Sequence, residues 1–180
     1  MLSNFSIFKE QIRSAPLFSI DLNAGENSTQ VVENNLDALS DLLDEKCAYE
    51  VFRQVHVAIT ELIFLSGRLT VTEKIAPDSK LEMIDDLLVS INEKQIKVYF
   101  AAKTTYDSSD AKLFIEQLSD VTDLTKKQLK KRIKSKIDNP EDSEDLIPIG
   151  LLEIHRMVAS PVLHNYFFEK SCLELILTFE

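Results

Sequence analysis

One acidic side chain lies within an apolar helical segment, where a carboxylate could act as a catalytic base. Glu61 interrupts the hydrophobic pattern of residues 49–66, and the alternative interpretation is a partly exposed polar residue at the edge of that helix. The histidines His56, His155 and His164 suggest a metal site or a phosphoryl acceptor. They are far apart in the sequence and lack ligand spacing, so we expect surface or satisfied histidines instead.

One short segment of the chain is densely basic. Between Thr125 and Ile137 there are seven cations and no acid, so with a net charge of −10 the rest of the chain carries −17. Three interpretations stay open: a solvated helix face, a surface for an acidic protein partner or for the chain's own acidic segment Glu141–Asp145, and a nucleic-acid contact. Leu129, Ile133 and Ile137 form a narrow apolar seam. The cations are Lys136 and the candidate partner-binding residues Lys126, Lys127, Lys130, Lys131, Arg132 and Lys134.

Length and composition limit the class of protein. The chain has 180 residues, of which 44% are hydrophobic and 28% charged, which is typical of a globular domain. Its apolar runs are too short for a transmembrane helix, and its beginning does not resemble a secretory signal. An acidic chain repels phosphate backbones, which disfavours general nucleic-acid binding. We therefore expect a cytoplasmic protein that does not bind membranes.

The pattern of apolar residues predicts an α+β fold, with a mostly antiparallel sheet and helices packed on one face. Strands and helices come in groups, and residues 1–180 form a single domain in which 1–16 are an N-terminal extension. The expected strands are 17–22, 69–72, 87–91, 96–102, 163–168 and 173–179. The expected helices begin near 29, 49, 108, 125 and 150, and a break is expected at Gly67.

Three segments, taken in order, carry a resemblance to a known family. They are Phe52–Leu69 with its Glu61, Val98–Thr105, and Ile147–Arg156 after a flexible loop. Their order and spacing resemble the SiaB family of bacterial protein kinases, which belongs to the GHKL ATPase superfamily. The resemblance covers residues 18–179 and implies a GHKL-like two-layer sandwich. It places residues 125–145, the basic helix and the acidic loop, in the lid region of that superfamily.

The resemblance also implies an ATP site, and several of its positions are altered here. Glu61 matches the family's glutamate and Arg68 a basic residue that follows it, but Leu65 stands where an asparagine would hold magnesium. Magnesium requires oxygen ligands, which leucine lacks. Lys103 and Thr104 replace a Ser-Gly-Asn-like turn on the adenine side. On the phosphate side only Gly150 survives of three glycines, and Pro148, which has no N–H, replaces another.

These changes favour a signalling protein of the SiaB kinase-like type that is a pseudokinase, with Glu61 as a relic of the catalytic base and no cofactor. The resemblance implies partner switching with a STAS-domain protein of the anti-sigma-factor antagonist kind. The alternative is an active Ser/Thr protein kinase that uses ATP and Mg²⁺ to phosphorylate such a partner. A nucleic-acid-binding adaptor is a third alternative, and a homodimer is compatible with each of them.

Overall fold

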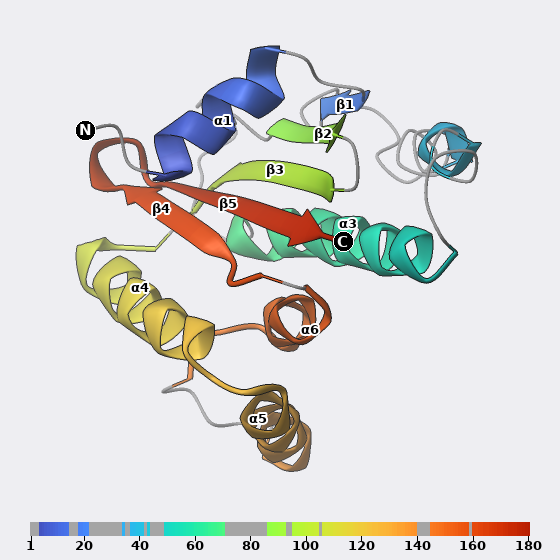
Figure 1. The fold of residues 1–180 in the computed structure, drawn as a ribbon. Helices are drawn as coiled ribbons and strands as arrows, with labels where there is room; N and C mark the ends of the chain where they lie inside the picture. Colours follow the sequence, from blue (N-terminus) through green and yellow to red (C-terminus); the bar gives the residue numbers. More distant parts are fainter. Residues whose placement is uncertain are drawn as a thin grey trace.

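The computed structural model shows a five-stranded sheet between helices (Figure 1). It describes residues 4–14, 18–21, 34, 37–41, 43, 49–70, 86–92, 95–104, 106–139, 145–158 and 160–180. The described helices are α1 (Asn4–Ser14), α3 (Tyr49–Thr70), α4 (Ser108–Thr122), α5 (Lys126–Asp138) and α6 (Ile149–Met157). The strands are β1 (Phe18–Asp21), β2 (Asp86–Asn92), β3 (Gln95–Lys103), β4 (Leu163–Phe167) and β5 (Cys172–Phe179). Residues 34, 37–41 and 43 are also helical, where the sequence predicts a helix.

The strand order is β1-β2-β3-β5-β4, and every pairing is antiparallel. The predicted hairpin of β2 and β3 is confirmed, with Val89 opposite Val98. The predicted terminal strand pair is also confirmed, with His164 opposite Leu175. Strand β5 inserts between β3 and β4, so the last strand of the chain lies inside the sheet and not at its edge. The α+β class predicted from the sequence is therefore correct.

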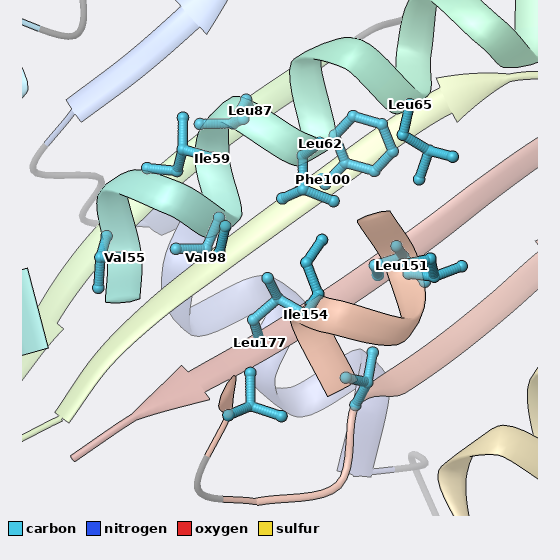
Figure 2. Close-up of a cluster of buried hydrophobic side chains, with 14 of the residues drawn as sticks. Val55, Ile59, Leu62, Leu65, Leu87, Val98, Phe100, Leu151, Ile154 and Leu177 are labelled. Carbon is cyan, nitrogen blue, oxygen red and sulfur yellow. The ribbon is translucent and has the colours of Figure 1, made fainter. Parts of the chain in front are cut away.

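One face of the sheet packs against α3 and α6 and forms the main hydrophobic core (Figure 2). Val98 and Phe100 of β3 meet Ile59 and Leu62 of α3, and all four side chains are fully buried. Alternate residues of a strand point to opposite faces of the sheet. The apolar residues of β3 that alternate with Val98 and Phe100 therefore point away from this core and must be covered on the other face.

The opposite face is covered by α1, which corrects the prediction that helices pack on one face only. Ile12 of α1 is fully buried against Tyr99, Ala101 and Ile176 of the sheet. The predicted N-terminal extension is therefore, over residues 4–14, a helix that completes the fold. Beta strands β3 and β5 are apolar on both faces, and each face needs a partner to exclude water.

The ends of several helices differ from the prediction. The expected break at Gly67 is wrong, because α3 continues to Thr70 and includes the first two residues of the predicted strand 69–72; the other two lie outside the described residues. A glycine within a helix costs about 1 kcal/mol, which the packing of one long apolar face can offset. Helix α4 is capped by Asp107, whose side chain accepts from the N–H groups of Ser109 and Asp110. Helix α6 begins at Ile149, next to the expected start near 150, and ends at Met157.

Among the described residues, every helix is too short or too polar to cross a membrane.

Candidate functional site

Glu61 of α3 lies against the first turn of α6. A Cβ added to Gly150 would overlap Oε2 of Glu61 and would lie 3.0 Å from its Cδ. The carboxylate therefore rests on the bare Cα of Gly150, near the N-terminus of α6, where the helix dipole favours a negative charge. Two residues that the sequence singles out separately are thus in direct contact, and the missing side chain of Gly150 makes this contact possible.

Leu65 and Pro148 line a small cavity beside this contact. Its volume is about 10 Å³, and its walls are Glu61, Phe64, Leu65, Pro148, Gly150 and Leu151. A space of that size is close to the smallest that can hold one water molecule. Leu65 is 3% exposed and Ile147 is fully buried, and both belong to the main core. Within the described part of the chain, Glu61 supplies the one side-chain oxygen among these walls.

Pro148 caps α6 without a side-chain hydrogen bond. Its carbonyl accepts from the N–H groups of Leu151 and Leu152, at 3.1 and 3.2 Å. Proline is well suited to this end of a helix, where a missing N–H costs nothing in the helix itself. Because proline has no N–H, position 148 also offers one donor fewer to a bound anion.

Lys103 and Thr104 lie at another place, at the end of β3 beside the β4–β5 hairpin. Lys103 is opposite Cys172 in the sheet. The N–H of Thr104 donates to the carbonyl of Ser171 at 2.7 Å, and its hydroxyl lies 2.5 Å from that of Tyr166. Neither residue lines the small cavity by Glu61. Arg68 falls in the last turn of α3, one turn beyond Leu65.

The basic segment forms α5, as predicted, and begins with a capping box between Thr125 and Gln128. Leu129 and Ile133 are buried, but Ile137 is 62% exposed, so the predicted apolar seam is one residue shorter than expected. Helix α5 packs on α6. Five lysines are exposed on the outer surface of α5: Lys126, Lys127, Lys130, Lys131 and Lys134. We call these five residues the lysine face.

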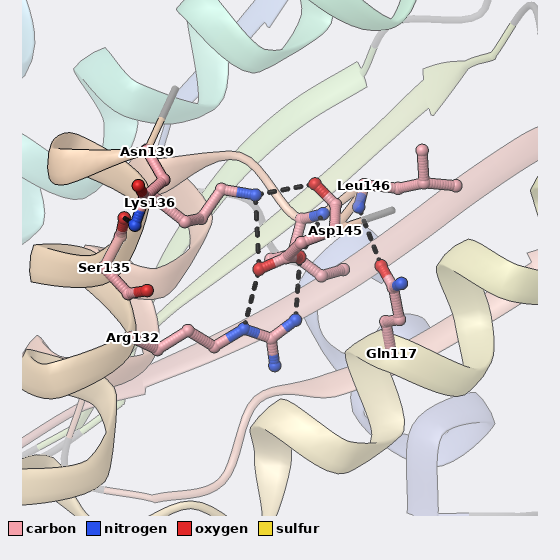
Figure 3. A network of polar contacts seen from close by, with 8 residues as sticks. Gln117, Arg132, Ser135, Lys136, Asn139, Asp145 and Leu146 are labelled. Carbon is pink, nitrogen blue, oxygen red and sulfur yellow. Dashed lines mark hydrogen bonds and ion pairs between the residues drawn. The ribbon is translucent and has the colours of Figure 1, made fainter. Parts of the chain in front are cut away.

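Asp145 ties α5 to the segment that opens α6 (Figure 3). Its carboxylate accepts two hydrogen bonds from Arg132, at 3.0 and 2.7 Å, and lies 3.3 Å from Nζ of Lys136. It also accepts from the N–H of Ile147, and Gln117 of α4 accepts from the N–H of Leu146. The pairing of the basic helix with the chain's own acidic segment, one of the open interpretations, therefore holds for Arg132 and Lys136.

Burial alone would raise the pKa of the Asp145 carboxyl. The hydrogen bonds from Arg132 and Ile147 and the charges of Arg132 and Lys136 outweigh burial, so the pKa lies below its ordinary value. Asp145 is thus ionised at neutral pH, and it holds the N–H of Ile147, the residue before Pro148, which lines the small cavity.

Two of the three histidines lie close enough for their charges to interact, which sequence spacing did not indicate. His155 of α6 is 8% exposed, and its Nε2 has no hydrogen-bond partner among the described residues. Burial, and then the charge of nearby His164, lower the pKa of His155 from 6.5 to about 4. His164 is half-buried, and its Nε2 lies 3.3 Å from the hydroxyl of Ser119. No group of three or more metal ligands occurs in the described ranges.

The buried His155 should make the protein less stable in mild acid. The unfolded chain binds a proton near pH 6.5, whereas the folded chain resists it until about pH 4. The unfolded state therefore binds more protons, and folding stability falls as the pH falls through this window, by about 2 kcal/mol between pH 6.5 and 5. His155→Leu should reduce that loss in urea titrations at the two pH values. An unchanged pH dependence in this variant would contradict the assignment.

Gly150→Ala should destabilise the fold through Glu61, by about 1–3 kcal/mol, because the added methyl group overlaps the carboxylate. Shortening the acid in the double variant Glu61→Ala, Gly150→Ala should recover most of that loss. Thermal unfolding of the two single variants and the double variant forms a cycle that isolates the contact. Additive losses would show that the two residues do not touch in solution.

The comparisons with known proteins identify a similar fold. No protein-family model matches this chain, and no curated protein matches its sequence. A chain in the crystal structure of the SiaB–SiaC complex from Pseudomonas aeruginosa matches with a TM-score of 0.69. The match covers 99% of this chain and 98% of that one at 15% sequence identity. The chain therefore has a SiaB-like fold over nearly its whole length, as the resemblance read from its sequence implies.

Proposed function

We propose that this chain is a signalling protein of the SiaB kinase-like type that acts by binding a protein partner and does not turn over ATP. Its partner would be acidic, with a STAS-domain protein as the first candidate, in a bacterial partner-switching pathway. The lysine face of α5 would be the binding surface. The fold supports the assignment to this type, since the solved chain of similar fold is part of a complex between two proteins.

The observation that carries the proposal is the way Glu61, Leu65 and Pro148 fill the space between α3 and α6. A carboxylate lies against the α6 N-terminus, where a nucleotide phosphate would need free N–H groups. Leu65 belongs to the hydrophobic core and offers no oxygen to magnesium. Among the residues that the structure describes, those between α3 and α6 do not fit an ATP–magnesium complex, because the cavity that they line is about 10 Å³.

The charge arrangement of α5 supports a binding role for its outer surface. Lys126 and Lys127 are in the first turn, where the positive end of the helix dipole disfavours them by a few tenths of a kcal/mol or more. The lysines are also spaced so that like charges adjoin along the helix, as at Lys127 and Lys131. Neither feature stabilises the helix, so the cluster is better explained by a partner of opposite charge, which it would attract over a distance.

Titration calorimetry with ATP in millimolar magnesium tests the catalytic half of the proposal. We expect no saturable heat, because the walls of the small cavity would have to move apart before a nucleotide could enter. A dissociation constant below about 1 mM, equivalent to roughly −4 kcal/mol, would favour the active kinase instead. The same titration with Glu61→Ala, which clears the carboxylate from Gly150, separates blockage by this side chain from loss of the site as a whole.

A further inference from the structure

Helix α4 carries a row of acidic side chains on its outer surface. Glu116, Asp120 and the C-cap residue Asp123 are four and three residues apart, so they lie along one line of the helix. Leu113, three residues before Glu116, continues the same line and is 40% exposed. All four side chains are exposed, and we call these four residues the acidic ridge.

Part of the lysine face of α5 has the same spacing in the opposite direction. Lys127, Lys130 and Lys134 are three and four residues apart, and Ile137, which is 62% exposed, follows after three more. Forward along α4 and backward along α5, the order is therefore the same: an exposed apolar residue and then three charges. The charges are negative on α4 and positive on α5. If two such helices lay antiparallel, each acid would face a lysine, and Leu113 would face Ile137.

These two complementary rows do not meet within one chain. Helix α5 packs on α6 with Leu129 and Ile133 buried, and Asp145 holds Arg132 and Lys136 on the side away from the lysine face. Figure 1 shows α4 and α5 running in different directions after the short connection between them. Among the ion pairs of the described residues, none joins α4 to α5. Both rows are therefore presented to solvent.

We propose that a second copy of this chain pairs with the first through these two helices. The acidic ridge of each copy would lie antiparallel against the lysine face of the other, so the dimer has a two-fold axis and two identical contacts. The rotation that sets α5 of one copy antiparallel to α4 of the other also sets α4 antiparallel to α5, whatever angle the two helices make within a chain. The residues that pair between copies would be Leu113 with Ile137, Glu116 with Lys134, Asp120 with Lys130, and Asp123 with Lys127.

The placement of these charges along their helices supports contact between copies. Asp120 lies in the last turn of α4 and Lys127 in the first turn of α5, and the helix dipole disfavours each charge where it stands. Neither charge stabilises its own helix, whereas each would stabilise the contact. The net charge of −10 also repels two copies, except where a lysine face meets an acidic surface. Exposed ion pairs are individually weak, so the dimer depends on concentration and on salt.

The dimer would cover part of the surface proposed above for an acidic partner. Lys127, Lys130 and Lys134 belong to both contacts, so self-association would compete with the partner. This regulatory consequence rests on the proposed function. The dimer itself does not, because it is a property of the purified chain without ATP or partner.

Sedimentation equilibrium of the full chain tests the dimer. At low salt we expect a dissociation constant below about 0.1 mM. The dimer should separate at about 1 M salt, where charges are screened beyond roughly 3 Å. Glu116→Lys with Asp120→Lys, and separately Lys130→Glu with Lys134→Glu, should each weaken association at least tenfold. The matched control, Glu50→Lys with Glu169→Lys, reverses two exposed acids outside α4 and should leave it unchanged.

A mixture of the two double variants is the decisive arm. Each variant alone carries like charges on α4 and α5, but in the mixture every altered ridge can face an altered lysine face, so a heterodimer should form. The proposal is overturned if the wild-type chain stays monomeric up to about 1 mM, the result expected if its own α4 and α5 close on each other. It is also overturned if the folded variants stay monomeric in the mixture, or if each alone dimerises as the wild-type chain does. A failure to capture an acidic partner would instead count against the proposed function alone.

Discussion

Leu65→Asn should lower the free energy of unfolding by roughly 3–5 kcal/mol, a large part of the stability of a domain of this size. Leu65 is 3% exposed within the main core, so the substitution removes buried apolar surface and places an amide where it finds no partner. Urea unfolding followed by circular dichroism measures the change. The matched control is Leu113→Asn on α4, where the leucine is 40% exposed and the same substitution should cost less than about 1 kcal/mol. Equal losses in the two variants would contradict the buried position of Leu65.

The same variant should not become a kinase, although it restores an oxygen ligand at the position that the resemblance assigns to magnesium. Pro148 still lacks an N–H, and the Glu61 carboxylate still lies against Gly150. One new magnesium ligand would not restore phosphate binding, because the N–H donor missing at Pro148 and the negative charge of Glu61 would both remain. Transfer of radiolabelled phosphate from ATP to a STAS-domain protein is the measurement. Transfer by either the wild-type chain or Leu65→Asn would contradict the pseudokinase proposal.

Strand pairs and long amphipathic helices could be predicted from the sequence because their signals are local. The alternation of apolar residues in β2 and β3, and the turn between them, fix a hairpin without reference to the rest of the fold. The apolar face of α5, with Leu129 and Ile133 four residues apart, predicts the helix in the same way. Ile137 continues that spacing, but its side chain is 62% exposed, which periodicity alone cannot indicate.

Contacts between distant segments could not be predicted, because no local pattern reports them. Glu61 and Gly150 each stood out in the sequence, yet their direct contact depends on how α3 crosses α6. Glu174 was missed altogether, although a lone acid in the apolar strand Cys172–Phe179 is a recognisable signal of a buried polar contact. The helix over residues 4–14 was missed as well, because the need to cover β3 and β5 on their second face becomes visible only once the sheet is assembled.

Charge reversal on the lysine face should abolish most partner binding while leaving the fold intact. Lys127, Lys130, Lys131 and Lys134 are exposed, so replacing all four with glutamate removes no buried contact. Arg132 and Lys136 are kept, and with them the attachment of Asp145 to α5. Exposed charges contribute little to stability, typically less than about 1 kcal/mol for a pair, and a glutamate at position 127 suits the helix N-terminus better than lysine does. The unfolding curve of the variant should therefore lie close to that of the wild-type chain.

Binding should respond far more strongly, because eight units of charge change at one surface. An acidic partner attracted by the wild-type lysine face would be repelled by the variant. We expect affinity to fall at least a hundredfold, and added salt, which slows association with the wild-type chain, should no longer slow association with the variant. Affinity capture from the native cell, comparing both proteins after each is shown to be folded, identifies the partner and reports the loss.

A smaller variant, Lys130→Glu with Lys134→Glu, allows a matched control. The control is Lys112→Glu with Lys170→Glu, which reverses the charge of two exposed lysines outside α5. Equal recovery of the same partners by all of these variants would show that the lysine face is only a solvated surface. Loss in the α5 pair alone would locate the binding surface on this helix, and nucleic acid in place of protein among the captured molecules would favour the adaptor.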